Sequence, residues 1–221
     1  MDGFVVKRAP GRLVYEKSKR AFDFISASVG LLLLAPIMLA IAISVKLDSP
    51  GPVLYLGRRV GRYGRMFFIY KFRTMRPEAE RLGTTTAKDD PRITRVGRFL
   101  RRYKLDEFPQ LLNVIKGEMS IVGPRPEVEE HTNAYSFEEK SILDVQPGIT
   151  DYASMYFVNL ADVLGSVNPH EMFVKGNIRN RKNQLRMQYV RNRSFLEDLK
   201  IIFKTLLVIV RHDRAAPRAG S

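Results

Sequence analysis

The feature that most constrains this chain is an uncharged, mostly apolar stretch of 22 residues near its N-terminus. It runs from Phe24 to Val45, between Asp23 and Lys46. As a straight helix it would measure about 33 Å, which is enough to cross the hydrocarbon core of a bilayer. It is not typical of a secretory signal peptide, because it starts late and lacks a small-residue cleavage site before the next folded segment. The stretch therefore predicts a membrane element.

The charges on both sides of this stretch favour a bent segment over a straight span. Lysines and arginines are frequent in residues 7–20 and again in residues 46–76. Because such residues mark the cytoplasmic side of membrane segments, both flanks are expected on that side. Pro36 lies just past the middle of the stretch and disrupts helical hydrogen bonding there. We therefore expect a re-entrant helix broken near Pro36, with a kinked transmembrane helix and a buried core helix as the alternatives.

The composition of the chain excludes several classes of protein. Its 221 residues are 45% hydrophobic, which excludes a wholly disordered chain, and they include no cysteine. Disulfide scaffolds, thiolate metal sites and cysteine nucleophiles are therefore excluded, and the three histidines are not spaced as zinc ligands. Lysine and arginine number 37 against 23 aspartates and glutamates, a net charge of +14. This excess predicts an anionic partner: nucleic acid, phospholipid headgroups or a phosphorylated substrate.

Turn signals and apolar patterns divide the chain into three expected parts. Residues 1–48 form a basic lead-in and the re-entrant helix, and the turn sequence Ser49-Pro50-Gly51-Pro52 closes them. Residues 49–210 form a compact domain, and residues 211–221 form a flexible tail. The fold class expected is α+β and mainly helical, with a small β-hairpin and amphipathic interfacial helices.

The elements expected within the compact domain follow from local periodicity and breaker residues. They are two strands at 53–55 and 66–70, a polar loop or short helix at 76–90, a cationic amphipathic helix at 92–104, a short helix at 108–115 ended by Gly117, an exposed helical run at 127–140 and an apolar helical segment at 195–210 that lies on the membrane or in the core.

Two adjacent acids, Asp106 and Glu107, are the strongest candidates for chemistry. They stand at an expected helix start, where the helix dipole favours phosphate. Arg101, Arg102 and Arg125 can clamp a diphosphate through bidentate contacts. A carboxylate facing a diphosphate is repelled unless a divalent cation lies between them, and Mg²⁺ is the usual choice. Asp106 can then bind the metal, attack phosphorus as a nucleophile, or do both.

Structural roles for the same residues are the alternative. Asp106 is then a helix N-cap, and Glu107 is a first-turn partner of the helix dipole. Arg125, which lies between two prolines, is then a surface charge on a rigid turn. Asp89 and Asp90 form a rival acidic pair, although the proline that follows them favours a loop.

Six short motifs follow one another between residues 71 and 150. They are Lys71-Phe72-Arg73-Thr74-Met75, Asp90-Pro91-Arg92-Ile93-Thr94, Gly97-Arg98-Phe99-Leu100-Arg101, Leu105-Asp106-Glu107-Phe108-Pro109-Gln110-Leu111-Leu112-Asn113-Val114, Gly117-Glu118-Met119-Ser120-Ile121-Val122-Gly123-Pro124-Arg125-Pro126 and Gln146-Pro147-Gly148-Ile149-Thr150. In this order they resemble the bacterial sugar transferase family, the monotopic polyprenyl-phosphate phosphoglycosyl transferases. The resemblance covers roughly residues 15–210, which is nearly the whole chain.

This resemblance implies an activity, a cofactor and roles for particular residues. Such enzymes need Mg²⁺ and move a sugar-1-phosphate from a UDP-sugar to a polyprenyl phosphate such as undecaprenyl phosphate, with release of UMP, as the first membrane step of glycoconjugate or polysaccharide assembly (EC 2.7.8-type). By resemblance, Asp106 is the nucleophile of a ping-pong cycle and carries the phosphosugar, and Glu107 assists metal binding or orientation. The cations expected to bind phosphate are Arg101, Arg125, Lys71 and Arg73.

The same resemblance predicts the location and the partners. The family inserts its N-terminal segment as a re-entrant helix broken near a proline, here Pro36, and a chain of this length lacks the additional membrane domain of longer relatives. We expect a monotopic protein of the bacterial inner (cytoplasmic) membrane, with its catalytic domain on the cytoplasmic face. The expected partners are a UDP-sugar donor, a polyprenyl phosphate acceptor and lipid headgroups, without nucleic acid. A homodimer is left open.

One departure from the family pattern concerns the sugar. Many members continue the Pro-Gly-Ile-Thr loop with a glycine and a small-Gln-Val run, whereas this chain has Asp151-Tyr152-Ala153-Ser154-Met155-Tyr156. The identity of the sugar therefore does not follow from the resemblance. Two other functions compete with the transferase: a non-enzymatic membrane-surface module that binds anionic lipid, and a nucleic-acid binder. The apolar stretch and the lack of a recognisable module disfavour the latter.

Overall fold

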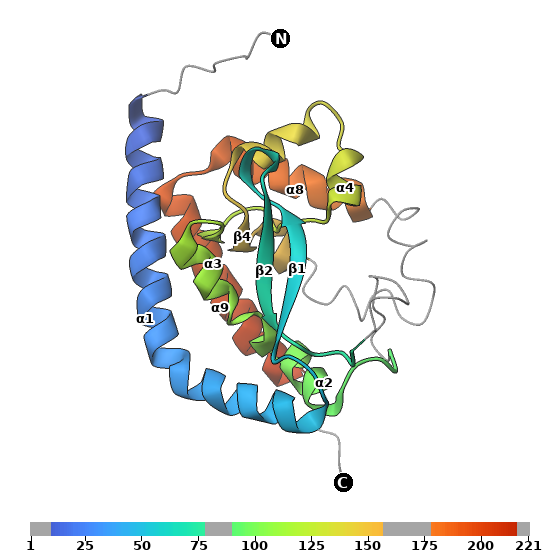
Figure 1. Cartoon of the computed structure of the whole chain (residues 1–221). Coiled ribbons are helices and arrows are strands. Elements are labelled where there is room, and N and C mark those ends of the chain that lie inside the picture. The colour runs from blue at the N-terminus through green and yellow to red at the C-terminus, as the bar shows by residue number, and fades with distance from the viewer. Residues whose placement is uncertain (1–9, 78–89, 157–177, 216–221) are drawn as a thin grey trace.

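The apolar stretch lies within one long helix, α1 (Pro10–Asp48), in a computed structural model that describes residues 10–77, 90–156 and 178–215 (Figure 1). The helix is long and apolar enough to cross a membrane. Its large apolar side chains are mostly exposed, and Leu32 for example is 77% exposed. The alternative of a buried core helix is therefore wrong.

The predicted break at Pro36 is not found, because α1 is a single helix that contains Pro36. Figure 1 shows instead that α1 bends, so that its second half runs in a different direction from its first half. A proline removes one backbone hydrogen bond, and a helix tolerates this loss by bending. The apolar helix is therefore bent without being interrupted.

A β-hairpin follows α1, as predicted, and its strands are longer than expected. Strand β1 (Leu54–Val60) pairs with β2 (Met66–Phe72) in antiparallel register, and a short turn, η1 (Arg62–Gly64), connects them. Side chains of β2 alternate, so that Phe67 and Ile69 are buried while Phe68 is exposed. The buried face packs with Ala27 of α1 into one of the core clusters. Through this cluster the hairpin packs between α1 and the residues that follow it in the chain, Val114 and Met119.

Three short helices carry the centre of the motif region. They are α2 (Arg95–Arg102), η3 (Leu105–Glu107) and α3 (Gln110–Lys116). Helix α2 begins where the Thr94 side chain accepts a hydrogen bond from the Gly97 backbone, and α3 ends at Gly117 in a left-handed conformation, as predicted. The polar segment expected at 76–90 lies almost wholly outside the described residues. Two of these helices, α2 and α3, thus hold the acidic pair of η3 between them.

The C-terminal half of the domain packs around a second small sheet, in which β3 (Ser120–Val122) pairs with β4 (Gly148–Thr150) in parallel. The helices around it are α4 (Glu129–Asn133), η4 (Glu139–Asp144), α5 (Tyr152–Tyr156), α8 (Ile178–Asn192) and α9 (Phe195–Ala215). The helical run expected at 127–140 is thus split into α4 and η4. Helix α9 continues to Ala215, past the start of the tail expected from residue 211, and residues 216–221 lie outside the described residues.

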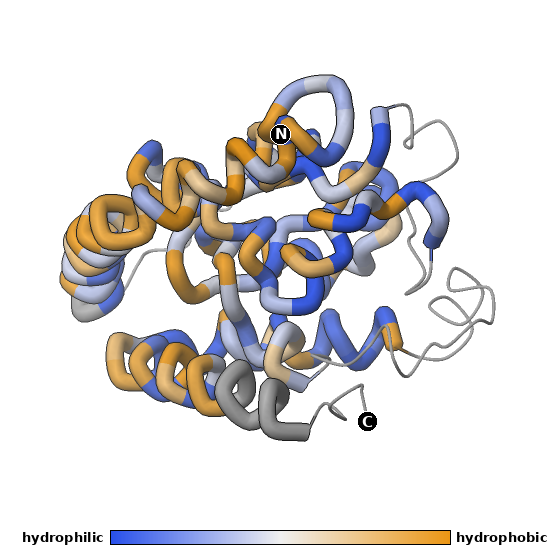
Figure 2. Tube along the Cα trace, turned by 90° about the horizontal axis from the view of Figure 1, so that it is seen from below, coloured by the Kyte–Doolittle hydropathy of each residue, from blue (hydrophilic) through white to orange (hydrophobic). Residues whose placement is uncertain are grey.

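Buried polar contacts fasten α1 to the C-terminal helices. Asp198 of α9, which is 3% exposed, accepts hydrogen bonds of 2.8 Å each from the Tyr15 hydroxyl, Lys19 Nζ and the Tyr189 hydroxyl. Figure 2 shows apolar residues along both α1 and α9 on the same side of the molecule. The mainly helical α+β class and the apolar N-terminal helix are confirmed, and the Asp198 cluster explains how that helix is attached to the rest.

Candidate active site

The acidic pair lies in η3, a single helical turn that faces the end of β2 and the loop containing Arg125. Lys104, just before η3, has a left-handed backbone (φ 57°), which turns the chain sharply between α2 and η3. Neither acid caps a helix: the residue that precedes η3 is Lys104, and no side chain caps its N-terminus. The alternative of a capping role for Asp106 is therefore wrong.

Glu107 is held by two cations from separate parts of the chain. Its Oε1 accepts a hydrogen bond from Lys71 Nζ at 3.0 Å and another from Arg125 Nη2, and its Oε2 accepts one from Arg125 Nη1 at 3.0 Å. Burial opposes ionisation, but the charges of Arg125 and Lys71 outweigh it and hold the pKa of Glu107 below its ordinary value. Glu107 is therefore an ionised carboxylate that fixes the two cations in place.

Asp106 is in the opposite situation. Its side chain is only 7% exposed, yet its carboxylate has no hydrogen-bond or ion-pair partner among the described residues. Burial raises the pKa of Asp106, while the nearby charge of Lys71 lowers it in part. A largely buried carboxylate without a hydrogen-bond partner among the described residues is costly for folding, which favours a role in binding or chemistry. Asp106 is thus the available group of the pair.

Arg101 lies beside the acidic pair, whereas Arg73 does not. Arg101 donates from Nε to Thr74 Oγ1 at 2.8 Å; burial lowers its pKa, and the charge of Asp106 opposes that shift. The guanidinium of Arg73 instead donates to backbone carbonyls at the end of α1, including that of Ser49 at 2.7 Å and that of Pro50 at 2.8 Å. Arg73 therefore caps the C-terminus of α1, and its guanidinium is directed away from the acidic pair.

Of the rival acidic pair, Asp90 is bound to Arg92, and Asp89 lies outside the described residues. Asp90 forms an ion pair with Arg92, with 2.6 Å between Oδ2 and Nη2, and its carboxylate also accepts from the Arg92 backbone. This geometry is typical of a closed turn, so it leaves Asp106 and Glu107 as the acidic pair at the candidate site.

The loop that presents Arg125 is fixed by two motifs that are distant in sequence. A Cβ on Gly148 would lie 2.0 Å from the Gly123 backbone nitrogen, so the two loops can pack this closely only with glycine. The Arg125 backbone donates to Asp151 Oδ2 at 3.2 Å, and the Asp151 side chain is fully buried. The Gln-Pro-Gly-Ile-Thr motif and Asp151, which follows it, therefore hold the Arg125 loop in position.

Sequence reasoning missed a further residue of this support, Arg186. Its Nη2 donates to Glu127 at 2.6 Å, two residues beyond Arg125, and its Nε lies 3.8 Å from Asp151 Oδ2. A signal was present in the sequence, because Arg186 shares a helical face with the apolar residues Tyr189 and Val190. An arginine on the apolar face of a helix is expected to be buried and paired.

The comparison with known families agrees with this arrangement. Residues 14–212 match the family described as bacterial sugar transferase. The chain belongs to the bacterial sugar transferase family. The membership predicted from the six motifs is thereby confirmed.

Three relatives show how similar this sugar transferase is to proteins with assigned names and how much of each it covers. It is 37% identical to the UDP-N-acetylgalactosamine-undecaprenyl-phosphate N-acetylgalactosaminephosphotransferase of Aeromonas hydrophila, over 89% of this chain and 44% of the relative. It is 39% identical to the UDP-glucose:undecaprenyl-phosphate glucose-1-phosphate transferase of Escherichia coli (strain K12), over 85% of this chain and 39% of the relative. It is also 39% identical to the exopolysaccharide production protein PSS of Rhizobium leguminosarum bv. phaseoli, over 86% of this chain and 93% of the relative. The chain thus spans less than half of the first two proteins and nearly all of the third.

The donor set of the sugar transferase fits a metal only in part. Among residues 10–77, 90–156 and 178–215, no group of three or more Asp, Glu or His side chains could hold a metal ion. Mg²⁺ is commonly bound by one or two carboxylates together with substrate phosphates, and the available carboxylate of Asp106 fits this pattern. Glu107 fits it less well, since Lys71 and Arg125 occupy its oxygens.

Proposed function

We propose that this protein transfers a sugar-1-phosphate from a UDP-sugar to a polyprenyl phosphate and releases UMP. The observation that carries the proposal is the available Asp106 carboxylate, which lies within a cluster of cations that Glu107 and Thr74 hold in place. The two named phosphotransferases to which the chain is similar act on undecaprenyl phosphate, which supports the choice of acceptor. Because their sugars differ, the donor sugar of this chain is not assigned.

In the proposed reaction, a carboxylate oxygen of Asp106 attacks the phosphorus that carries the sugar. The bond from that phosphorus to the UMP oxygen breaks, and UMP leaves with the electron pair. A phosphate oxygen of the lipid then attacks the same phosphorus, the bond to Asp106 breaks, and the carboxylate is regenerated. Mg²⁺, when bound, would reduce the repulsion between Asp106 and the phosphates. Arg101, Arg125 and Lys71 stabilise the added negative charge.

A covalent intermediate also suits the shape of the site. The lipid phosphate and the nucleotide-sugar are both anions, and the described residues place one cationic cluster around Asp106. If the two substrates bind in turn, the same cations serve both of them without bringing the two anions together. The proposed cycle is therefore ping-pong.

The experiment that tests the function measures UMP release by the purified full chain in detergent with Mg²⁺ and undecaprenyl phosphate. A panel of UDP-sugars, including UDP-glucose and UDP-N-acetylgalactosamine, is supplied one at a time. We expect UMP release with at least one donor, dependent on the acceptor for more than one turnover, and its loss on chelation of Mg²⁺. Absence of UMP with every donor, alongside retained binding to anionic lipid vesicles, would instead support the membrane-surface module.

We also propose that α1 enters and leaves the same leaflet, so that the protein is monotopic in the bacterial inner membrane with its catalytic domain in the cytoplasm. The bend of α1, its exposed apolar residues and its cationic flanks support this topology. Because the chain has no cysteine, single cysteines can be introduced as reporters at Lys17 and at Arg58. We expect membrane-impermeant maleimide to label neither position in intact spheroplasts and both after lysis. Labelling of only one position from outside would show that α1 spans the bilayer.

A further inference from the structure

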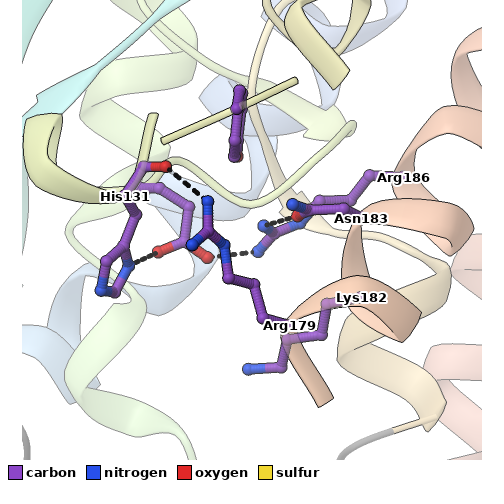
Figure 3. A pocket seen from close by; sticks show the side chains of 7 residues that line it. His131, Arg179, Lys182, Asn183 and Arg186 are labelled. Carbon is purple, nitrogen blue, oxygen red and sulfur yellow. Dashed lines mark hydrogen bonds and ion pairs between the residues drawn. The ribbon is translucent and has the colours of Figure 1, made fainter. Parts of the chain in front are cut away.

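One buried side-chain amide has no hydrogen-bond partner among the described residues. It belongs to Gln110, the first residue of α3, whose side chain is fully buried and whose Oε1 and Nε2 are both unpaired. A buried amide elsewhere in the domain shows the usual arrangement: Asn183 accepts from Arg186 at 3.2 Å and donates to Glu139 at 2.9 Å, and Figure 3 shows Asn183 beside Arg186. Because a buried amide without partners is costly for folding, the position of Gln110 favours a role in the reaction.

Gln110 lies one helical turn after Asp106. The backbone between them is helical, because Asp106 belongs to η3, Phe108 (φ −53°, ψ −37°) and Pro109 (φ −62°, ψ −14°) have right-handed helical angles, and α3 begins at Gln110. Residues four apart in a helix are neighbours on one face, with about 5–6 Å between their Cβ atoms. A buried carboxylate and a buried amide, neither of them paired within the part of the chain that the structure describes, are therefore neighbours.

The same face of α3 packs against β2. Asn113, three residues after Gln110, accepts a hydrogen bond from the Tyr70 backbone at 3.0 Å, and residues three apart in a helix share a face. At the other end of this segment, Phe108 packs against the core cluster that contains Phe72. Gln110 lies between Phe108 and Asn113 in sequence. It is therefore placed beside the C-terminal end of β2.

That end of β2 carries Lys71. Side chains alternate along a strand, so Lys71 points to the same side as Ile69, which is buried in the cluster that α3 joins. An ammonium group has three donors, and Glu107 accepts one of them from Lys71 at 3.0 Å. An amide between Lys71 and Asp106 meets a complementary group at each end, because its oxygen accepts from the ammonium and its nitrogen donates to the carboxylate.

We propose that Gln110 is a positioning residue for Asp106: its Nε2 donates to one carboxylate oxygen of Asp106 while its Oε1 accepts from Lys71. Because Gln110 is fully buried, it acts on the substrate only through these two neighbours. The inference rests on the proposed function, in which the other oxygen of Asp106 forms the bond to phosphorus as the bond to the UMP oxygen breaks. The hydrogen bond from Gln110 fixes the carboxylate, so that the attacking oxygen keeps a lone pair directed at phosphorus.

The test compares wild type and Gln110→Met in the rate at which the protein gains a phosphosugar. The full chain in detergent is mixed with Mg²⁺ and the UDP-sugar that supports UMP release, without acceptor, and the reaction is quenched at intervals for intact-mass measurement. We expect Gln110→Met to slow formation of the adduct about tenfold to a hundredfold, which is the effect of one hydrogen bond to a charged group. The donor concentration that gives half the maximal rate should stay unchanged, since Gln110 does not contact the donor.

Thermal unfolding distinguishes this role from a structural one. Methionine removes two buried polar atoms that lack partners within the described ranges, so Gln110→Met should unfold at the wild-type temperature or a higher one. The matched control is Gln188→Met, the same change at an exposed position of α8, which should alter neither the rate nor the unfolding temperature.

Three results for Gln110→Met would overturn the proposal: a wild-type rate, a higher donor requirement at an unchanged maximal rate, or a lower unfolding temperature. The first would show that Asp106 needs no help from the amide, the second that Gln110 binds the donor, and the third that it supports the fold. Each of these leaves adduct formation by the wild type intact. A wild type that gains no phosphosugar with any donor would instead contradict the proposed function itself.

Discussion

Replacing Asp106 with asparagine is expected to lower UMP release about a thousandfold or more, because the amide cannot form the proposed covalent bond to phosphorus. Asparagine has nearly the same shape, so the ion pairs of Glu107 with Lys71 and Arg125 should remain. The direct readout is intact mass. Wild-type protein given UDP-sugar and Mg²⁺ without acceptor should gain the mass of one phosphosugar, and Asp106→Asn should gain none.

The stability of this variant separates chemistry from folding. Because burial raises the pKa of Asp106 above its value in the unfolded chain, ionised Asp106 destabilises the fold near neutral pH and a neutral side chain relieves that cost. We therefore expect Asp106→Asn to unfold at the same temperature as the wild type or a higher one. A variant that is both inactive and less stable would point to a structural role, and a variant with normal UMP release would show that the site is placed wrongly.

The pH profile supplies a second readout of the same residue. The nucleophile must be ionised, so kcat/KM should fall as pH falls through the pKa of Asp106 in the folded enzyme. Because that pKa is raised from 3.8, the acid limb of wild-type activity is expected at a higher pH than an exposed aspartate would give. Glu107 does not contribute to this limb, since its pKa is lowered and it stays ionised. A rate that is constant down to pH 3.8 would contradict the assignment.

Replacing Asp198 with alanine is expected to destabilise the protein by about 3–5 kcal/mol, the largest stability effect that we predict. The substitution removes the acceptor of Tyr15, Lys19 and Tyr189 together and leaves the Lys19 charge, 13% exposed, without its carboxylate. Unpaired polar groups in a buried place cost their full desolvation free energy. Because the three donors come from α1 and α8, the loss should loosen α1 from the domain.

Thermal unfolding in detergent measures this effect, and limited proteolysis locates it. Asp198→Ala should unfold at a clearly lower temperature and be cleaved early in the first half of α1, which contains Tyr15 and Lys19. The matched control is Glu130→Ala, which removes an exposed carboxylate from α4 and should leave both measurements unchanged. Equal unfolding temperatures for the two variants would show that the Asp198 cluster does not hold the helices together.

Individual helices and strands could be predicted from the sequence because each has a pattern of residues within its own segment. The apolar stretch lies within α1, and the run of aromatic and β-branched residues at 66–70 lies within β2. The acidic pair could be found because it stands at an expected helix start directly after an arginine-rich helix, within one of the six motifs. Arg125 could be proposed as a phosphate ligand from its charge and its place in the Gly-Pro-Arg-Pro loop, the family resemblance gave it the same role, and the structure brings it to Glu107.

Two features of the site could not be predicted from the sequence: the direction in which a side chain points and the contacts between residues that are distant along the chain. Lys71 and Arg73 are two residues apart, so a continuous strand would point them to the same face. The strand ends at Phe72, however, and Arg73 turns to the end of α1. Asp151 and Arg186 support Arg125 across 26 residues or more, and no local pattern indicates which loop a buried arginine meets.

The way in which α1 is attached has a consequence for how the lipid is reached. Near its start, Tyr15 and Lys19 are bound to Asp198, and at its other end Arg73 binds the carbonyls of Ser49 and Pro50. Because both ends of α1 are bound to the same domain, the helix cannot change its angle relative to that domain. In the proposed topology, the height of Asp106 above the acyl chains is therefore a fixed dimension of the molecule. The lipid acceptor must therefore bring its phosphate to that height in order to reach Asp106.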